Sequence, residues 1–469
     1  MKKIHTFEDD ALGNLDAVGV AEAIAAKKVS PEEIVEAAIN RAEKADEHLG
    51  AIVYKYYNEA RKNAAQIGGF FNGVPTFVKD NEDMKGVPTQ FGTKAFKAKP
   101  AKRNSQFVNQ FISTGLNVIG KTSLPEFGLV CSTENPKWGI TRNPWNTGYT
   151  PGGSSSGSAA MVASGVVPIA MANDGAGSTR IPASCCGLVG LKPSRNRLKN
   201  FEGSNALPIN IGYEGVLTRS VRDTIAFYTA AEQYYQNKKL PPIGSNLQPI
   251  NKRLKIVYYE NLPEGKMGHQ DDDTQKTILE TAKLLEDLGH YVECRPFPID
   301  VDFMANHFLR YYGFLAFFMK DLSRIVLNAK MKKDELENFT TGLSKHFTGN
   351  VTKLPSSLSL LKKTGAQIES TFNEFDIALT PVLSHSVPKI GYFDPTLPYE
   401  EISRRAVGFA SYTGLQNITG SPAISLPLGT SSEGLPIGAH LIAPLGQDRL
   451  LLELSLQIEL AKPFRKIYE

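Results

Sequence analysis

Residues 150–160 read Thr-Pro-Gly-Gly-Ser-Ser-Ser-Gly-Ser-Ala-Ala, and residues 173–182 read Asn-Asp-Gly-Ala-Gly-Ser-Thr-Arg-Ile-Pro. These are two separate glycine-rich turns, with Ser154 in the first and Ser178 in the second. Because glycine has no Cβ, successive backbone N–H groups of such a turn can point at one spot. A developing oxyanion needs that arrangement. The two turns therefore indicate a site where a serine attacks a carbonyl group.

The first turn alone also fits two ordinary structures, a flexible linker and the N-cap turn of a helix. A linker does not explain the sequence that follows, because an apolar, helix-like run over 159–167 leads directly to the second turn. Upstream, a β-type run over 73–79 ends in Lys79. The three segments together favour a catalytic site.

Lys79, Ser154 and Ser178, in this order and in these surroundings, resemble the signature of the amidase signature family of serine hydrolases. The resemblance also includes the segments 120–127, 139–145, 186–193, 376–381, 417–425 and 434–438. It implies an α/β fold, with a single large domain whose central mixed, twisted β-sheet is flanked by helices.

A serine hydroxyl is a poor nucleophile without a base, and none of the eight histidines lies in the three signature segments. A lysine can act as the base only when it is neutral, which requires a buried position that lowers its pKa. The resemblance implies that neutral Lys79 accepts a proton from Ser154, and that Ser154 accepts one from the nucleophile Ser178. It also implies a cis peptide bond between Gly153 and Ser154.

Further roles are expected for the residues around the second turn. Asp174 and Arg180 are interpreted as supports that hold the turn, and Ser155 as either a support or a plain turn residue. The oxyanion hole is expected from four backbone N–H groups, those of Gly175, Ala176, Gly177 and Ser178.

The pocket is the least transferable part of the resemblance. The usual family turn reads Asp-Thr-Gly-Gly-Ser, whereas residues 174–178 read Asp-Gly-Ala-Gly-Ser, so the pocket shape cannot be carried over directly. The stretch 174–195 looks most like the branch that contains cyclic-dimer hydrolases of 6-aminohexanoate. Pocket walls are expected from the helical region 303–345 and from four consecutive residues, Gly128, Leu129, Val130 and Cys131.

The pattern along the chain predicts one amidase domain over residues 1–469. We expect helical cover over 1–65, the catalytic core over 66–230, a variable, helix-rich insertion over 231–372, and core strands with a final helix over 373–469. Two local patterns are specific. The sequence Ser-Pro-Glu-Glu over 30–33 predicts a capping box at a helix start, and residues 253–297 read as a β-α-β unit.

The composition is that of an ordinary globular protein, with 469 residues, 41% hydrophobic and 21% charged. A formal charge of +4, spread over the chain, gives little support for nucleic-acid binding. The four cysteines lack metal-ligand spacing, so we expect no metal and no cofactor. The N-terminal residues lack a signal-peptide pattern and no apolar run reaches about 18 residues, so we expect a cytoplasmic protein without membrane contact.

Two other motifs suggest different functions. Residues 115–122 match the phosphate-loop formula G-x-x-x-x-G-K-[ST], but the loop interior is β-like and Pro125 discourages an immediate helix, so we interpret the match as accidental. The aromatic run over 311–319, with lysines beyond it, fits a membrane-surface helix or, better, core or pocket packing.

The function predicted from these observations is amidase activity. The enzyme would hydrolyse the C–N bond of small linear or cyclic carboxamides through a serine acyl-enzyme, with esters as further substrates. One alternative is the A subunit of a tRNA-dependent amidotransferase, and another is a non-catalytic binding module on an amidase scaffold. A small amide is the expected partner, and a homodimer is one option for the oligomeric state.

Overall fold

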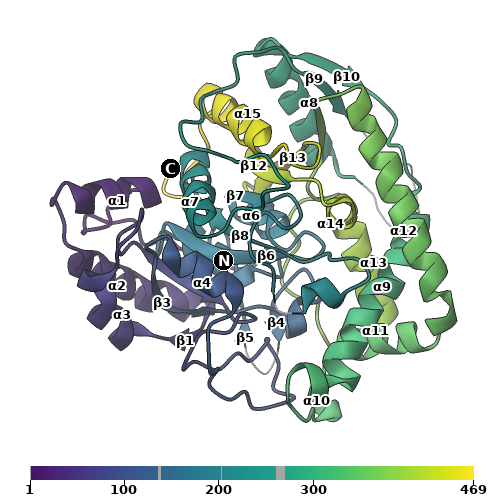
Figure 1. Cartoon of the computed structure of the whole chain (residues 1–469), viewed down its shortest axis with the longest axis horizontal. Helices are drawn as coiled ribbons and strands as arrows, with labels where there is room; N and C mark the ends of the chain where they lie inside the picture. The colour runs from purple at the N-terminus through teal and green to yellow at the C-terminus, as the bar shows by residue number, and fades with distance from the viewer. Residues whose placement is uncertain (1, 136–138, 202, 260–269) are drawn as a thin grey trace.

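The structure is a computed structural model that describes residues 2–135, 139–201, 203–259 and 270–469 (Figure 1). The chain is built around an eight-stranded mixed sheet in the order β10-β9-β11-β13-β12-β7-β8-β6. Its strands are β6 Ile169–Asp174, β7 Val189–Lys192, β8 Tyr213–Thr218, β9 Lys255–Tyr258, β10 Tyr291–Cys294, β11 Ile377–Pro381, β12 Ala423–Thr430 and β13 Pro436–Ile442. This large sheet, flanked by helices, confirms the predicted α/β fold of a single domain.

Two smaller sheets accompany it. Three strands pair in the order β1-β3-β2, and the other two form a short ribbon. Their bounds are β1 Ile52–Lys55, β2 Pro75–Lys79, β3 Asn117–Thr122, β4 Glu134–Asn135 and β5 Gly139–Ile140. Every residue of β2 and β3 is buried, as is usual for strands that are covered on both faces.

The helices fall into groups that follow the chain. The first half contributes α1 Ala17–Ala25, α2 Pro31–Leu49, α3 Tyr57–Asn63, α4 Gln106–Ser113, α5 Ser156–Ala163, α6 Arg180–Cys186 and α7 Val221–Tyr234. The second half contributes α8 Asp272–Asp287, α9 Val301–Asp321, α10 Ser323–Val326, α11 Asn338–Thr348, α12 Leu354–Glu369, α13 Tyr399–Phe409, α14 Gly414–Thr419 and α15 Asp448–Ala461. Figure 1 shows α1–α3 on one side of the molecule and α9–α13 on the other.

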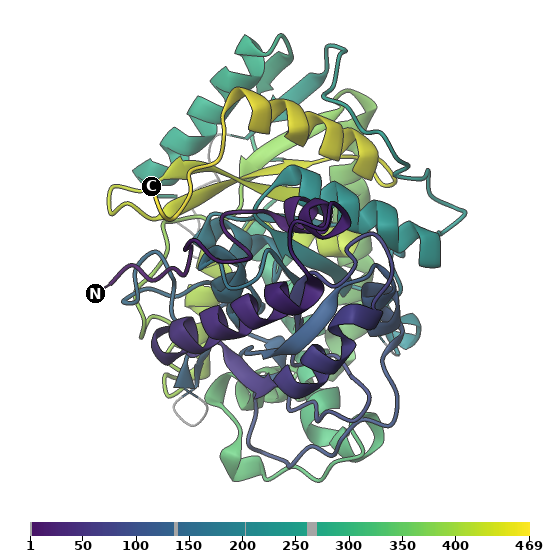
Figure 2. The ribbon, with the colours of Figure 1, turned by 90° about the vertical axis from the view of Figure 1, so that its left-hand side faces the viewer.

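The local sequence predictions that the structure tests are confirmed. The side chain of Ser30 accepts from the backbone N–H of Glu33, and the Glu33 carboxylate accepts from that of Ser30, which is the predicted capping box before α2. Strands β9 and β10 pair in parallel and α8 lies between them in the chain, which is the predicted β-α-β unit. After the helical segment, the chain returns to the large sheet as β11, which pairs with β9. In Figure 2 the C-terminal strands and helix, in yellow, lie above the N-terminal helices, in purple.

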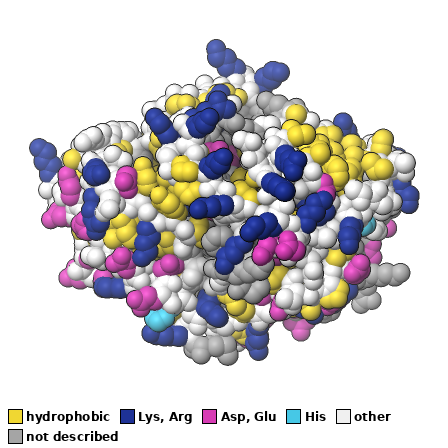
Figure 3. Space-filling view, turned by 90° about the horizontal axis from the view of Figure 1, so that it is seen from below, with side chains coloured by type: hydrophobic (Ala, Val, Ile, Leu, Met, Phe, Trp, Pro, Cys, Tyr) yellow, Lys and Arg dark blue, Asp and Glu magenta, His cyan; other side chains and the backbone are white. Residues whose placement is uncertain are grey.

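The structure also accounts for the phosphate-loop match and the aromatic run, the two motifs that suggest other functions. Residues 117–122 of the phosphate-loop match form strand β3, and the Lys121 amine makes a buried ion pair with Asp80 at 2.8 Å. The aromatic run lies in α9, where Tyr311 is fully buried and its hydroxyl donates to the carbonyl of Ile209. No helix of the described residues has the length and apolar character needed to cross a membrane. On the face in Figure 3, basic and acidic side chains are interspersed.

Candidate active site

The three signature residues come from three different elements that meet beside the central sheet. Lys79 is the last residue of β2, Ser154 lies in the loop before α5, and Ser178 lies in the turn between β6 and α6. The two serine turns are joined through the backbone, where the N–H of Ser155 donates to the carbonyl of Ser178 at 3.3 Å. The peptide bond between Gly153 and Ser154 is cis, as the resemblance implies.

The Lys79 amine is fully buried and contacts three oxygens. Its Nζ lies 2.8 Å from Ser154 Oγ, 3.1 Å from Ser155 Oγ and 2.6 Å from Asn173 Oδ1. An amide oxygen can only accept a hydrogen bond, whereas a hydroxyl can also donate one. A neutral amine has two N–H groups and one lone pair. It can therefore donate to Asn173 and Ser155 and accept the proton of Ser154.

Burial decides the protonation of this lysine. It lowers the pKa of Lys79 to about 7, against the opposing negative charges of Glu214, Asp174 and Glu82. A large fraction of the amine is then neutral near neutral pH. Lys79 thus occupies the desolvated position that a lysine needs in order to be neutral.

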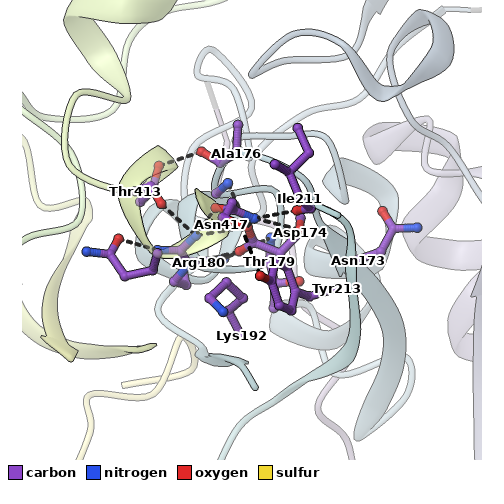
Figure 4. A network of polar contacts seen from close by, with 12 residues as sticks. Asn173, Asp174, Ala176, Thr179, Arg180, Lys192, Ile211, Tyr213, Thr413 and Asn417 are labelled. Carbon is purple, nitrogen blue, oxygen red and sulfur yellow. Dashed lines mark hydrogen bonds and ion pairs between the residues drawn. The ribbon is translucent and has the colours of Figure 1, made fainter. Parts of the chain in front are cut away.

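The turn that carries Ser178 is held by an ionic clamp (Figure 4). Arg180 and Asp174, both almost fully buried, make two hydrogen bonds of 2.9 Å each. The side-chain amide of Asn417 donates to the backbone carbonyl of Asp174 at 2.8 Å and to its carboxylate at 2.9 Å. Burial raises the pKa of Asp174, but the charge of Arg180 outweighs this effect and holds that pKa well below its usual range.

The clamp also engages one of the four backbone N–H groups expected in the oxyanion hole. The N–H of Gly177 donates to the Asp174 carboxylate at 2.7 Å. Within the described part of the chain, the N–H groups of Gly175, Ala176 and Ser178 have no hydrogen-bond partner. In this arrangement three of the four donors are free, and that of Gly177 serves the turn itself.

Ser178 lies at the wall of a cavity of about 90 Å³. All four consecutive residues expected in the pocket, 128–131, line it, as do Met304, Phe308 and Tyr312 of α9. The Tyr312 hydroxyl donates to the carbonyl of Gly128 at 3.3 Å and so joins the two walls. None of the described residues that line the cavity is charged.

Two parts of the site are absent from the sequence prediction. The third wall of the cavity comes from Ala406 in α13 and from Ala410 and Ser411 in the turn between α13 and α14. Sequence reasoning places the C-terminal hundred residues among core strands and so does not expect a wall there. The second part is Asn173, which could have been found in the sequence from its position next to Asp174 at the end of a strand. Neighbouring residues of a strand point to opposite faces, so Asn173 faces away from the clamp of Asp174 (Figure 4).

One contact that the resemblance implies, between the hydroxyls of Ser154 and Ser178, is not formed in the part of the chain that the structure describes. No hydrogen bond between the side chains of Ser154 and Ser178 is found among the described residues. The same part of the chain has no group of three or more His, Cys, Asp or Glu side chains placed to hold a metal ion.

Comparison with known proteins identifies the family. A family model described as amidase matches residues 33–452. A Mycobacterium leprae protein named "Putative amidase AmiC" is 44% identical over 470 residues, which cover 100% of this chain and 99% of that protein. The solved structure of 6-aminohexanoate cyclic dimer hydrolase with its substrate gives a TM-score of 0.88 at 26% identity and covers 98% of each chain. A bacterial aryl acylamidase of the amidase signature family gives 0.85 at 26% identity and covers 97% of each chain.

The chain therefore belongs to the amidase signature family. It is an amidohydrolase that acts on carbon–nitrogen bonds.

Proposed function

We propose that the protein hydrolyses uncharged carboxamides through an acyl-enzyme on Ser178, with Ser154 as proton relay and Lys79 as base. The observation that carries this proposal is the 2.8 Å contact between Lys79 Nζ and Ser154 Oγ in a fully buried position. No other role readily accounts for a buried amine with three neutral oxygens around it and a pKa of about 7.

The reaction begins when Ser178 Oγ attacks the amide carbonyl carbon. Its proton passes to Ser154 Oγ while the proton of Ser154 passes to Lys79 Nζ. In many enzymes such catalytic hydrogen bonds tighten only in the Michaelis complex, and the proposal places the contact between Ser178 and Ser154 there. The C–N bond then breaks, and the amine leaves with the proton that returns through Ser154. Water attacks the acyl ester along the same relay, which releases the acid and restores Ser178.

The negative charge of the tetrahedral intermediate is stabilised by backbone N–H groups. Those of Gly175, Ala176 and Ser178 are free for this role, and a single such donor contributes about 3 to 4 kcal/mol in a known hydrolase. The oxyanion hole expected from the sequence also includes the N–H of Gly177. For its N–H to take part, the hydrogen bond to Asp174 would have to open.

The cavity supports an uncharged substrate with an apolar group next to the scissile amide. Its walls carry the side chains of Leu129, Met304 and Phe308 and no charge, so a charged group would lose its hydration without a partner. The two solved relatives above are named for a cyclic amide dimer and for aryl acylamides. Small linear or cyclic carboxamides, with esters as further substrates, fit this site.

The alternative functions have less support. The Mycobacterium leprae relative and a 6-aminohexanoate-cyclic-dimer hydrolase that is 29% identical over 96% of this chain are named as an amidase and a hydrolase rather than as binding modules. The amidotransferase A subunit would require a partner protein, and no described feature of this chain calls for one.

A substrate panel tests the proposal. The purified protein is assayed with a nitroanilide of a short fatty acid, with a cyclic lactam, and with an analogue of the anilide that carries a carboxylate on its acyl chain. We expect turnover of the uncharged anilide and a kcat/KM at least about 100-fold lower for the charged analogue, since the cavity offers that charge no partner. Equal rates for both anilides would refute the assignment of the cavity, and no turnover of any amide or ester would refute the hydrolase.

A cytoplasmic location and a homodimer, both raised by the sequence, remain part of the proposal. The four cysteines, Cys131, Cys185, Cys186 and Cys294, form no disulfide, which is typical of a reducing compartment. Light scattering coupled to size-exclusion chromatography measures the oligomeric state, and fractionation of the source cells tests the location.

A further inference from the structure

Two buried glutamates near Lys79 have no role in the proposed mechanism. Glu214 in β8 and Glu82, three residues after β2, are each only 3% exposed. Placing two carboxyl groups in the interior is costly unless their charge is used or neutralised. Glu214 is the largest of the charges that raise the pKa of Lys79, ahead of Asp174 and Glu82, and Glu82 in turn raises the pKa of Glu214.

A single side chain connects Glu214 to the amine. Asn173 and Glu214 are direct partners in the antiparallel pairing of β6 with β8. Asn173 Oδ1 accepts a hydrogen bond from Lys79 Nζ at 2.6 Å. The NH2 group of the same amide hydrogen-bonds the carboxyl group of Glu214. Because the NH2 end of the Asn173 amide faces Glu214, its oxygen faces Lys79.

The two carboxyl groups cannot both be ionised at low cost. Burial raises the pKa of Glu82 to about 7, while the hydroxyl of Ser105 donates to its carboxylate. Burial and the neighbouring Glu82 raise the pKa of Glu214 well above its usual value, and no described donor reaches Glu214 Oε2. Like charges this close titrate as a unit. The pair therefore carries less than two full negative charges near neutral pH.

The other charges around the amine are already neutralised. The Asp174 carboxylate is paired with Arg180, and Asp80 is paired with Lys121. Lys121 and Asp83 act on Glu82 with opposite signs. Of the three carboxyl groups whose charges act on Lys79, Glu214, Asp174 and Glu82, only the two glutamates have no salt-bridge partner among the described residues.

We propose that Glu214 and Glu82 form a buried carboxyl pair that positions Lys79 through Asn173 and supplies the counter-charge for the ammonium formed when Lys79 accepts the serine proton. This inference rests on the proposed function of Lys79 as the base. Glu214 and Glu82 are positioning residues, since they act through the lysine and do not contact the reacting atoms.

The consequence is a defined change in the pH dependence of kcat/KM. A negative charge near an amine favours its protonated form, so its removal lets Lys79 lose its proton at lower pH. Glu214→Gln keeps the shape and an accepting oxygen for Asn173 but removes the charge. We expect the midpoint of the rising limb to move to lower pH by about one unit. The plateau should fall several-fold, because a less basic amine takes the proton less readily.

The experiment measures kcat/KM against pH for the wild type, Glu214→Gln, Glu82→Gln and a control, Glu459→Gln. Glu459 in α15 is also a partly buried carboxyl whose pKa is raised by burial, and it is not among the charges that act on Lys79. We expect a shift to lower pH for Glu214→Gln, a smaller one for Glu82→Gln and none for Glu459→Gln. Thermal unfolding and labelling by a fluorophosphonate show which variants are folded. If Glu214→Gln does not fold, Glu82→Gln carries the test.

Two outcomes would overturn the inference. One is an unchanged midpoint in every folded variant of the pair, and the other is a shift to higher pH. Lys79→Ala, assayed in parallel, separates this inference from the proposed function. If Lys79→Ala is inactive and the glutamate variants leave the midpoint unchanged, only the carboxyl pair loses its role. If Lys79→Ala retains activity, the proposed base itself is wrong.

Discussion

Asp80, the residue directly after Lys79, forms its ion pair with Lys121 and not with Lys79. The Asp80–Lys121 pair is almost fully buried, with an N–O distance of 2.8 Å. Asp80 lies directly beyond the end of β2, and Lys79, the last residue of that strand, meets only neutral oxygens. Of these two buried lysines, Lys121 contacts a carboxylate, whereas Lys79 has surroundings that allow it to be neutral.

Loss of any residue of the relay should be severe and not additive. We expect Ser178→Ala to lower kcat on the order of 10⁴-fold with an intact fold, as for other nucleophile deletions. Ser154→Ala and Lys79→Ala should each be severe, and the triple variant little worse than the worst single one. Single-turnover and steady-state rates check this. Losses that multiply across the variants would show that the three residues act independently.

Gly128 is expected to be essential for the position of Ser154. It has a φ of +69°, and a Cβ added there would lie 3.1 Å from Ser154 Oγ. Gly128→Ala should therefore lower kcat by more than about tenfold, because both the strained backbone and the added methyl displace the relay serine. Gly434→Ala is the matched control, with a φ of +80° and nothing within 4 Å of the added Cβ. Equal losses in both variants would attribute the effect to backbone strain alone.

The ion pair of Asp174 with Arg180, which holds the turn that carries Ser178, should make the free energy of unfolding depend on pH. Because Arg180 holds the pKa of Asp174 below its unfolded value, this carboxylate contributes stability that is fully present above about pH 4 and is lost as the pH falls further. Asp174→Asn should cost about 3 to 5 kcal/mol, since it leaves the buried Arg180 charge unpaired. Urea unfolding at pH 7 and at pH 3 measures both effects. A variant as stable as the wild type at pH 7 would show that the pair is not needed for the fold.

The sequence predicted the fold from short, local patterns, and the candidate signature residues rest on patterns of the same kind. Lys79 at a strand end and the two glycine-serine turns are contiguous motifs, and a capping box needs only four residues. The contact of Asn173 with Glu214 depends instead on the register of β6 against β8, which no local pattern sets. The cavity wall from Ala410 needs the packing of α13 beside α9. The engagement of the Gly177 N–H by Asp174 is a detail of turn geometry that a list of glycines does not reveal.

Reaction with a fluorophosphonate should map the nucleophile. An activated serine attacks phosphorus as it attacks a carbonyl carbon, so peptide mapping by mass spectrometry should find the label on Ser178. EDTA should leave the rate of labelling unchanged, because the proposed base is an amine. A label on Ser154, or inhibition by EDTA that added metal reverses, would require a different mechanism.

The pH profile of Lys79→Arg tests the central claim most directly. The wild-type kcat/KM should rise with pH along a limb centred near pH 7, which belongs to the coupled system of Lys79, Ser154 and Ser178. Arginine keeps the charge but cannot become neutral in this range, so Lys79→Arg should be nearly as inactive as Lys79→Ala over the whole profile. A Lys79→Arg enzyme with near-normal activity and an unchanged profile would show that the residue is a structural cation and would contradict its role as the base.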